Sequence, residues 1–277
     1  MTGIYDDPRA YELACGFRDI PAEVAALLRW AGRHRPQDAA PVRTVLELAA
    51  GPAEHAREFA ARGIEATALD LNPAMCAYAA ERAAAAGLPV RAVQGDMSDF
   101  RLEQRFDLII TMLDSTAHLM TLDAFVAHLD RVADHLAAGG VYIVEMSHPA
   151  DRLGERARTT NAWRLEVAGE RVDVRWGEPR DRLDPITQVV NDHVTIAVTS
   201  NGATRVVKGV VPYRFWTATE LAAAVRLAGS LEITACYGDF TDIGVDDPAA
   251  WRLISVLRPA GDRLDIGQGA GAHPGIG

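Results

Sequence analysis

Short apolar runs alternate with amphipathic segments along the first half of the chain. The runs at residues 44–49, 64–71, 90–94, 107–113 and 141–146 predict buried strands. Segments with apolar residues at helical spacing separate them, at residues 21–34, 53–63, 72–87 and 121–140. Strands that are apolar along their whole length are typical of a parallel sheet covered by helices on both faces. We therefore expect an α/β fold with a doubly wound sheet.

The pattern changes after residue 150. Residues 161–176 predict a hairpin that turns near Gly169, and residues 187–216 predict two strands joined at Asn201-Gly202. The α/β rhythm then returns, with a helix at residues 217–229 and strands at residues 231–237 and 251–257. An antiparallel β insertion therefore interrupts the α/β domain.

These patterns divide the chain into four parts. Residues 1–40 are expected to form an N-terminal helical cap, and residues 41–150 and 216–259 the α/β core. Residues 151–215 form the insertion, as a roof over the substrate or an interface for another subunit. The glycine-rich residues 260–277 are expected to be a flexible tail.

Composition narrows the class of partner. The chain has 277 residues and a net charge of −10, and it lacks a basic cluster, so nucleic acid and anionic membranes are unsuitable partners. Cys15, Cys76 and Cys236 are far apart, and no metal-binding spacing is present. No apolar run approaches the roughly 20 residues of a membrane helix. We expect a cytoplasmic protein with a small-molecule substrate and no metal.

The stretch "VLELAAGPAEHA" (residues 45–56) predicts a strand, a turn and a helix. A dinucleotide site in this position uses three glycines, whereas here only Gly51 is present. Pro52 also removes a backbone N–H where a pyrophosphate would bind. The turn therefore favours a cofactor without phosphates.

Carboxylates follow the next strands at the same edge of the predicted sheet. Asp70 ends its strand 19 residues after Gly51, where an acidic side chain accepts hydrogen bonds from ribose hydroxyls. Asp96 follows the third strand, and Asp114 follows the fourth. Ligands of open α/β sheets bind at this edge, so these residues predict a binding site.

Four segments in this order resemble the motifs of class I S-adenosylmethionine-dependent methyltransferases. They are "VLELAAGPA", "ALDLNPAM", "QGDMSDF" and "FDLIITMLDS", within a resemblance that covers roughly residues 1–150 and 217–258. The resemblance implies a Rossmann-like, seven-stranded, mostly parallel sheet and S-adenosyl-L-methionine as cofactor. It implies that the cofactor's methionine part meets Glu47, Ala49, Gly51 and Met112, its ribose meets Asp70, and its adenine meets Leu71, Asp96 and Met97.

The first motif departs from the family at Ala53, where a second glycine is usual. An alanine there is compatible with the motif if the backbone does not require glycine. Alternatively, the substitution indicates a changed cofactor position, with Ala53 close to the methionine end.

Three residues at the predicted sheet edge are candidates for proton transfer. Asp114 and His118 follow the fourth strand, and His148 follows the fifth. The structural alternatives are a helix cap for Asp114, a surface position for His118 and a hinge beside Pro149 for His148. Candidate substrate contacts are Tyr5, Tyr11, His193 and Arg214, for which packing or a solvated sheet face is the alternative.

The leading hypothesis is methyl transfer from S-adenosyl-L-methionine to the nitrogen or oxygen of a small molecule, in specialised metabolism. A second hypothesis keeps the fold but replaces methyl transfer with elimination or ring closure. A third is a non-catalytic partner subunit, with the insertion as its interface. A homo-oligomer formed through the insertion is also compatible with the sequence.

Overall fold

A seven-stranded, mostly parallel sheet forms the centre of the molecule, as predicted. The computed structural model describes residues 3–153, 157–167 and 169–261. The strand order is β10-β11-β5-β4-β1-β2-β3. The strands are β1 (Thr44–Leu48), β2 (Glu65–Asp70), β3 (Val90–Gln94), β4 (Phe106–Thr111), β5 (Leu136–Ser147), β10 (Leu231–Tyr237) and β11 (Arg252–Pro259).

The direction and order of these strands fix where a ligand can bind. Strands β1 to β5 pair in parallel, whereas β11 is antiparallel to both β5 and β10. The strand order reverses between β1 and β4, where chain connections leave toward opposite faces of the sheet. In doubly wound folds, ligands bind in the crevice at the carboxyl ends of such strands.

Helices cover both faces of the sheet. One core cluster joins α2 (Ile20–His34) and α3 (Glu54–Ala61) to the sheet, and a second joins α5 (Leu122–His135) and α6 (Ala218–Ala228) to it. Helix α4 (Pro73–Ala85) packs against β2 and β3. Its start follows the predicted signals, because Asn72 Oδ1 accepts a hydrogen bond from Ala74 N at 2.8 Å and Pro73 occupies the first helical position.

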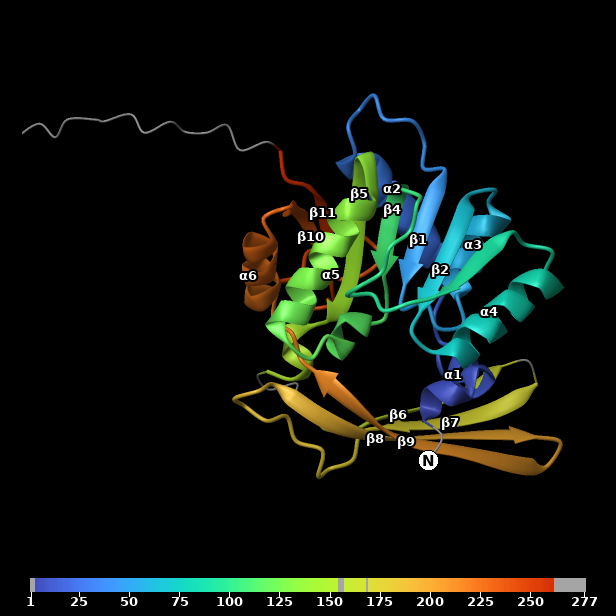
Figure 1. The fold of residues 1–277 in the computed structure, drawn as a ribbon. Helices are drawn as coiled ribbons and strands as arrows, with labels where there is room; N and C mark the ends of the chain where they lie inside the picture. Colours follow the sequence, from blue (N-terminus) through green and yellow to red (C-terminus); the bar gives the residue numbers. More distant parts are fainter. Residues whose placement is uncertain (1–2, 154–156, 168, 262–277) are drawn as a thin grey trace, which may run out of the picture.

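A separate four-stranded sheet lies beneath the carboxyl ends of the parallel strands (Figure 1). It contains β6 (Asn161–Val167), β7 (Glu170–Trp176), β8 (Val189–Ser200) and β9 (Ala203–Arg214), which pair as consecutive antiparallel neighbours. The predicted hairpin turn is confirmed, because Asn201 and Gly202 have φ angles of 51° and 76°. This sheet is the antiparallel insertion predicted from the sequence.

The predicted cap of residues 1–40 divides into two structurally different parts. The short helix η1 (Ile4–Asp6) and α1 (Pro8–Ala14) lie between α4 and the four-stranded sheet (Figure 1). Helix α2 instead packs on α3, and its Trp30 is fully buried in the main core. Most of the predicted tail, residues 262–277, lies outside the described residues.

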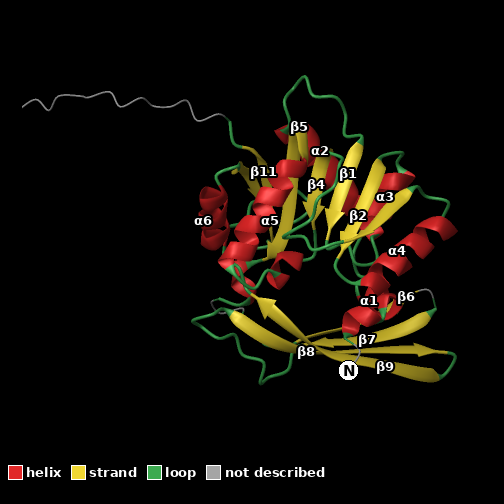
Figure 2. Ribbon diagram, in the orientation of Figure 1, coloured by secondary structure: helices red, strands yellow, loops and turns green. Residues whose placement is uncertain are grey.

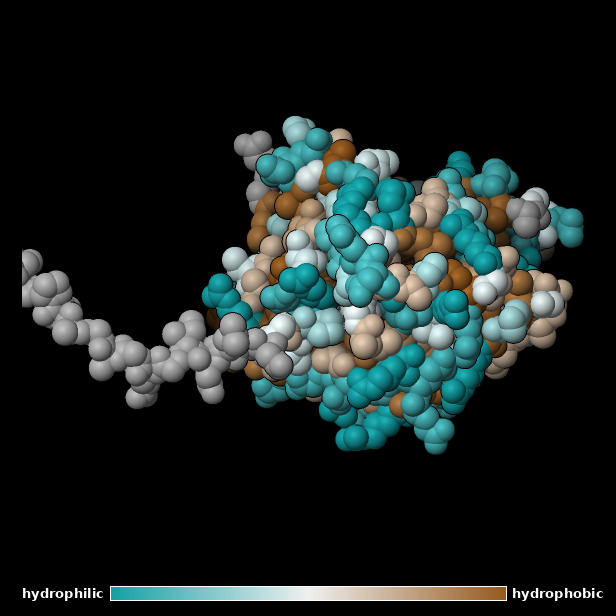
Figure 3. Space-filling view, turned by 90° about the horizontal axis from the view of Figure 1, so that it is seen from above, coloured by the Kyte–Doolittle hydropathy of each residue, from teal (hydrophilic) through white to brown (hydrophobic). Residues whose placement is uncertain are grey.

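Loops gather between the two sheets, and the face seen from above mixes polar and apolar residues. Figure 2 shows loops between the lower ends of the parallel strands and the four-stranded sheet. Seen from above, hydrophilic and hydrophobic residues are interspersed over the surface (Figure 3).

Within the described residues, no helix has the length and apolar character needed to cross a membrane. The same residues contain no cluster of potential metal ligands.

Candidate active site

A large cavity opens between the carboxyl ends of the parallel strands and the four-stranded sheet. Its volume is about 1490 Å³. Its wall combines the loops after β1, β2, β3 and β4 with residues of the amino-terminal segment, β8 and β9. Ligand pockets usually measure about 300–1,000 Å³, so this cavity has room for a cofactor and an acceptor together.

The turn after β1 keeps a glycine-like backbone with two alanines in it. Ala49, Gly51 and Ala53 have φ angles of 51°, 53° and 58°. Alanine in the left-handed region costs roughly 1–2 kcal/mol, which the surrounding packing must offset. Ala53 is completely buried in the helix–sheet core and is not part of the cavity wall. The prediction that Ala53 forms part of the cavity wall is therefore wrong, and Ala53 instead packs between helix and sheet.

Asp70 joins this turn to the start of α4. Its Oδ2 accepts a hydrogen bond from Gly51 N at 2.7 Å, and its Oδ1 accepts one from Asn72 N at 2.8 Å. Burial raises the pKa of Asp70. A carboxylate has about four acceptor positions, so Asp70 can accept further hydrogen bonds on the cavity side.

Four further residues form the neighbouring part of the wall. Leu71 is exposed, whereas Met97 and Met112 are buried in the wall itself. Asp96 Oδ1 accepts hydrogen bonds from Ser98 N at 2.8 Å and Ser98 Oγ at 2.7 Å. The structure thus brings together the positions that the resemblance assigns to adenine and to the methionine end.

Glu47 also lies in the wall, but its carboxylate is held by α3. Its Oε2 accepts a hydrogen bond from Ala56 N at 2.9 Å, and its Oε1 contacts His55 Nδ1 at 3.1 Å. His55 Nε2 contacts Glu23 Oε2 at 2.9 Å. Since both ring nitrogens face carboxylates, the doubly protonated imidazolium fits this site best.

The pKa of His55 reflects two opposing effects. Burial lowers it, but the contacts with Glu23 and Glu47 outweigh burial and raise the pKa to about 9. A raised folded-state pKa adds stability that is complete below the unfolded-state pKa and disappears above the folded-state pKa. This contribution is therefore complete below about pH 6.5 and lost as the pH rises through about 9.

We expect the free energy of unfolding to fall between about pH 6.5 and pH 9, and we expect His55→Gln to weaken this pH dependence. Urea unfolding at a series of pH values measures both. The difference between the wild type and the variant isolates His55 from other groups that titrate in this range. Equal slopes in the two proteins would show that His55 is not charged in the folded state.

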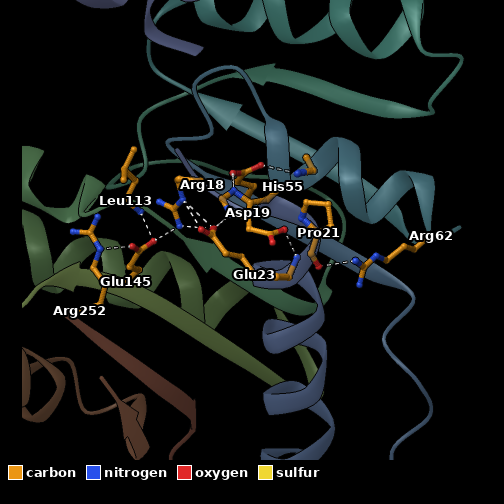
Figure 4. Close-up of polar contacts among 12 residues, drawn as sticks. Arg18, Asp19, Pro21, Glu23, His55, Arg62, Leu113, Glu145 and Arg252 are labelled. Carbon is orange, nitrogen blue, oxygen red and sulfur yellow. Dashed lines mark hydrogen bonds and ion pairs between the residues drawn. The ribbon is translucent and has the colours of Figure 1, made fainter. Parts of the chain in front are cut away.

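A buried network of charges extends from this histidine across the site (Figure 4). Arg18 Nη2 contacts Glu23 Oε2 at 2.5 Å and Glu145 Oε2 at 2.7 Å. Arg252 Nε contacts Glu145 Oε1 at 2.8 Å. Sequence reasoning missed this network, although Glu145 is a charged residue inside the apolar run "VYIVEM" and provided a signal.

Arg18 has one guanidinium nitrogen left for a ligand. Its side chain is 3% exposed and lies in the cavity wall. Its Nη1 is buried and has no hydrogen-bond partner among the residues that the structure describes. A buried guanidinium nitrogen without a partner is costly, so an anionic ligand group would complete its contacts.

Asp114 lies in the cavity wall at the end of β4. Its Oδ2 accepts a hydrogen bond from Ser147 Oγ at 2.5 Å, and Ser147 Oγ is 2.8 Å from the Tyr213 hydroxyl. Burial raises the pKa of Asp114 to about 7. A carboxyl group with this pKa can both accept and release a proton near neutral pH.

His118, Tyr5 and Tyr11 form an adjacent aromatic group in the wall. His118 Nε2 is 3.1 Å from the Tyr5 hydroxyl, and the Tyr5 and Tyr11 rings meet edge to face at 5.3 Å. Desolvation in the cavity wall lowers the pKa of His118. The amino-terminal segment thereby closes one side of the cavity.

Comparison with known proteins agrees with this geometry. Residues 45–140 match a family profile described as "Methyltransferase domain". The chain is 28% identical to the cypemycin N-terminal methyltransferase of a Streptomyces species, over 84% of this chain and 91% of that protein. A crystal structure of an S-adenosylmethionine-dependent methyltransferase from Clostridium acetobutylicum superimposes with a TM-score of 0.74 at 18% identity, covering 90% of this chain and 96% of that one.

Residues 45–140 of this chain therefore form a methyltransferase domain. The chain is also 33% identical to a dTDP-3-amino-3,4,6-trideoxy-alpha-D-glucopyranose N,N-dimethyltransferase of Streptomyces venezuelae. That match covers 37% of this chain and spans 41% of the length of the sugar methyltransferase. The family and fold inferred from the four sequence motifs are therefore confirmed.

Three predicted site residues lie outside the cavity of this methyltransferase. His148 Nδ1 accepts a hydrogen bond from Ala150 N at 3.2 Å, and its Nε2 is 2.9 Å from the Val245 carbonyl, so both nitrogens are used structurally. His193 Nδ1 contacts Asp181 Oδ1 at 2.7 Å.

The third of these, Arg214, packs over the Trp216 ring at 3.7 Å and donates to the Met120 carbonyl at 3.1 Å. The adjacent residues Asp192 and Tyr213 line the cavity instead. Side chains alternate between the two faces of a strand, so each prediction on β8 and β9 missed the cavity by one residue.

Proposed function

We propose that this methyltransferase binds S-adenosyl-L-methionine and methylates an amine nitrogen of a small molecule in specialised metabolism. The main support is the position of Asp114, a carboxylate with a pKa of about 7 in the wall of a cavity large enough for two ligands. The names of the two relatives described above, an N-terminal methyltransferase and an N,N-dimethyltransferase, support nitrogen as the acceptor atom.

The residues around the turn after β1 suit the cofactor. Arg18 Nη1 is a donor without a partner and could bind the carboxylate of the cofactor. Asp70 can accept further hydrogen bonds, which the ribose hydroxyls of the cofactor could donate. Leu71, Asp96 and Met97 would surround the adenine, while Ala49, Gly51 and Met112 would line the methionine part. The bound cofactor supplies an electrophilic methyl group on its sulfonium. Glu47 would act indirectly, by holding His55 and the start of α3.

The acceptor side has to remove a proton from the amine. An ammonium has no lone pair, so the nitrogen must lose a proton before or during methyl transfer. The Asp114 carboxylate would accept this proton, while Ser147 Oγ donates a hydrogen bond to Asp114 Oδ2 and fixes its orientation. Tyr5, Tyr11 and His118 would shield this region from water and position the acceptor.

We expect Asp70→Ala to weaken cofactor binding about tenfold or more, because charge-assisted hydrogen bonds contribute roughly 1.5–3 kcal/mol. The variant also loses the hydrogen bonds that Asp70 accepts from Gly51 and Asn72, which hold the turn. Calorimetric titration with S-adenosyl-L-methionine measures the effect. The control is Asp99→Ala, which removes a nearby exposed carboxylate outside the cavity wall. An unchanged dissociation constant in folded Asp70→Ala would remove Asp70 from the ribose site.

The same titration of the wild type tests the proposed function. We expect saturable binding of the cofactor, and S-adenosylhomocysteine together with an N-methylated product when an amine acceptor is supplied. No heat of binding at millimolar cofactor would contradict the proposal. Formation of an O-methylated product alone would contradict the choice of nitrogen.

A further inference from the structure

The arginines of the cavity wall are largely neutralised by buried carboxylates. The wall contains Arg18, Arg152, Arg158 and Arg252, and no lysine. Arg18 and Arg252 both contact Glu145, and Arg152 Nη2 contacts Asp192 Oδ2 at 3.0 Å. Within the described ranges of the chain, Arg158 forms no ion pair. Among the described residues, Arg158 is therefore the one arginine of this wall without a carboxylate partner, and a diphosphate group would find the other three already paired.

Asp192 is the most deeply buried acidic residue on the acceptor side. It is 0% exposed, and its Oδ2 accepts hydrogen bonds from Arg152 Nη2 and from Trp176 Nε1 at 3.1 Å. Its Oδ1 has no partner among the described residues, although Asp192 belongs to the cavity wall. A buried acceptor without a partner is destabilising, so a donor supplied by a ligand would stabilise it.

The register of the four-stranded sheet links Asp192 to the proposed proton acceptor. Val190 pairs with Tyr213 and Asp192 pairs with Val211, so Asp192 and Tyr213 are diagonal neighbours on one face. The Arg152 guanidinium carbon is 5.5 Å from the centre of the Tyr213 ring. Since Tyr213 also contacts Ser147, a continuous row of polar groups runs from Asp114 to Asp192. Asp192 therefore faces the acceptor region.

We propose that the acceptor is an amine without phosphate groups and that Asp192 is a specificity-determining residue. This inference rests on the proposed methyl transfer to nitrogen. Asp192 would accept a hydrogen bond from an ammonium or hydroxyl group of the acceptor through Oδ1. Asp192 Oδ2 also holds the Arg152 guanidinium, which would therefore not be available to bind a phosphate group. Selectivity against a wrong ligand commonly arises when the charges of that ligand are left without partners.

The test measures binding of thymidine 5′-diphosphate, a nucleoside diphosphate probe, to the full chain saturated with S-adenosylhomocysteine. We expect the wild type to bind it with a dissociation constant above about 1 mM. Asp192→Asn should bind at least tenfold more tightly, because Arg152 is then free to contact phosphate. The control is His193→Gln, which alters the adjacent side chain on the opposite face of β8 and should match the wild type.

Two results would overturn this inference. A wild-type dissociation constant for thymidine 5′-diphosphate well below about 1 mM would show that the cavity accepts a nucleoside diphosphate. Unchanged binding in folded Asp192→Asn would show that Asp192 does not control access to Arg152. Both outcomes are separate from the proposed function, which fails only if S-adenosyl-L-methionine does not bind or no amine is methylated.

Discussion

Asp114→Asn is expected to lower kcat by roughly 10²–10⁴-fold while leaving the affinity for S-adenosyl-L-methionine nearly unchanged. Asparagine has the same shape as aspartate and tolerates the left-handed backbone of this position, where φ is 59°. It can still accept the hydrogen bond from Ser147, but it cannot take up a proton from the amine. The variant therefore removes proton acceptance and preserves the shape of the site.

The pH dependence provides a second measurement of the same role. Burial raises the pKa of Asp114 to about 7, and only the deprotonated carboxylate can accept a proton. The rate should therefore rise as the pH increases through about 7, and Asp114→Asn should lose this step. Asp134→Asn, which alters an exposed carboxylate on α5, is the matched control. A variant that keeps both the wild-type kcat and its pH step would exclude Asp114 as the proton acceptor.

The central fold could be predicted from the sequence because its signals are local. Apolar runs located the parallel strands, Asn72-Pro73 located the start of α4, and Asn201-Gly202 located a hairpin turn. The turn after β1 shows the limit of such signals. Ala53 adopts a backbone conformation that glycine prefers, and only its burial shows that it belongs to the core. Long-range packing, which the local sequence does not encode, determines that placement.

The acceptor side was harder to predict for a different physical reason. On β8 and β9, His193 and Arg214 have the more conspicuous chemistry, but their neighbours Asp192 and Tyr213 face the cavity. Which face of a strand points inward depends on how the whole sheet packs, and the polar residues occur on both faces. On β8, however, Asp192 shares its face with the buried Val190, Val194, Ile196 and Val198, so the alternation was a signal for Asp192 that sequence reasoning missed. On β9 apolar residues occur on both faces, and alternation could not choose there.

The charged network depends even more on distant contacts. Arg18, Glu145 and Arg252 come from three separate parts of the chain and meet only in the folded structure. A charged residue in an apolar strand predicts a buried partner or a function, but not which residue is the partner. This network connects the amino-terminal segment to the centre of the sheet, so it should matter for both stability and ligand binding.

Glu145→Gln is expected to destabilise the folded protein by about 3–5 kcal/mol, because removing one member of a buried ion pair leaves the others uncompensated. Glu145 is 0% exposed and contacts both Arg18 and Arg252. At roughly 2–4 °C per kcal/mol for a chain of this size, the melting temperature should fall by about 6–20 °C. Differential scanning calorimetry measures this change. Glu232→Gln on β10, which alters an exposed ion pair with Arg258 on β11, should have little effect.

The acid limb of the stability curve tests the same network independently. Burial raises the pKa of Glu145, but Arg18 and Arg252 outweigh burial and lower the pKa to about 2. A lowered folded-state pKa adds stability that is present above the unfolded-state value of about 4.5 and is lost as the pH falls toward 2. Glu145→Gln should therefore have a shallower loss of stability across this range. If the variant and the wild type lose stability equally between pH 4.5 and pH 2, Glu145 is not the charged centre of the network.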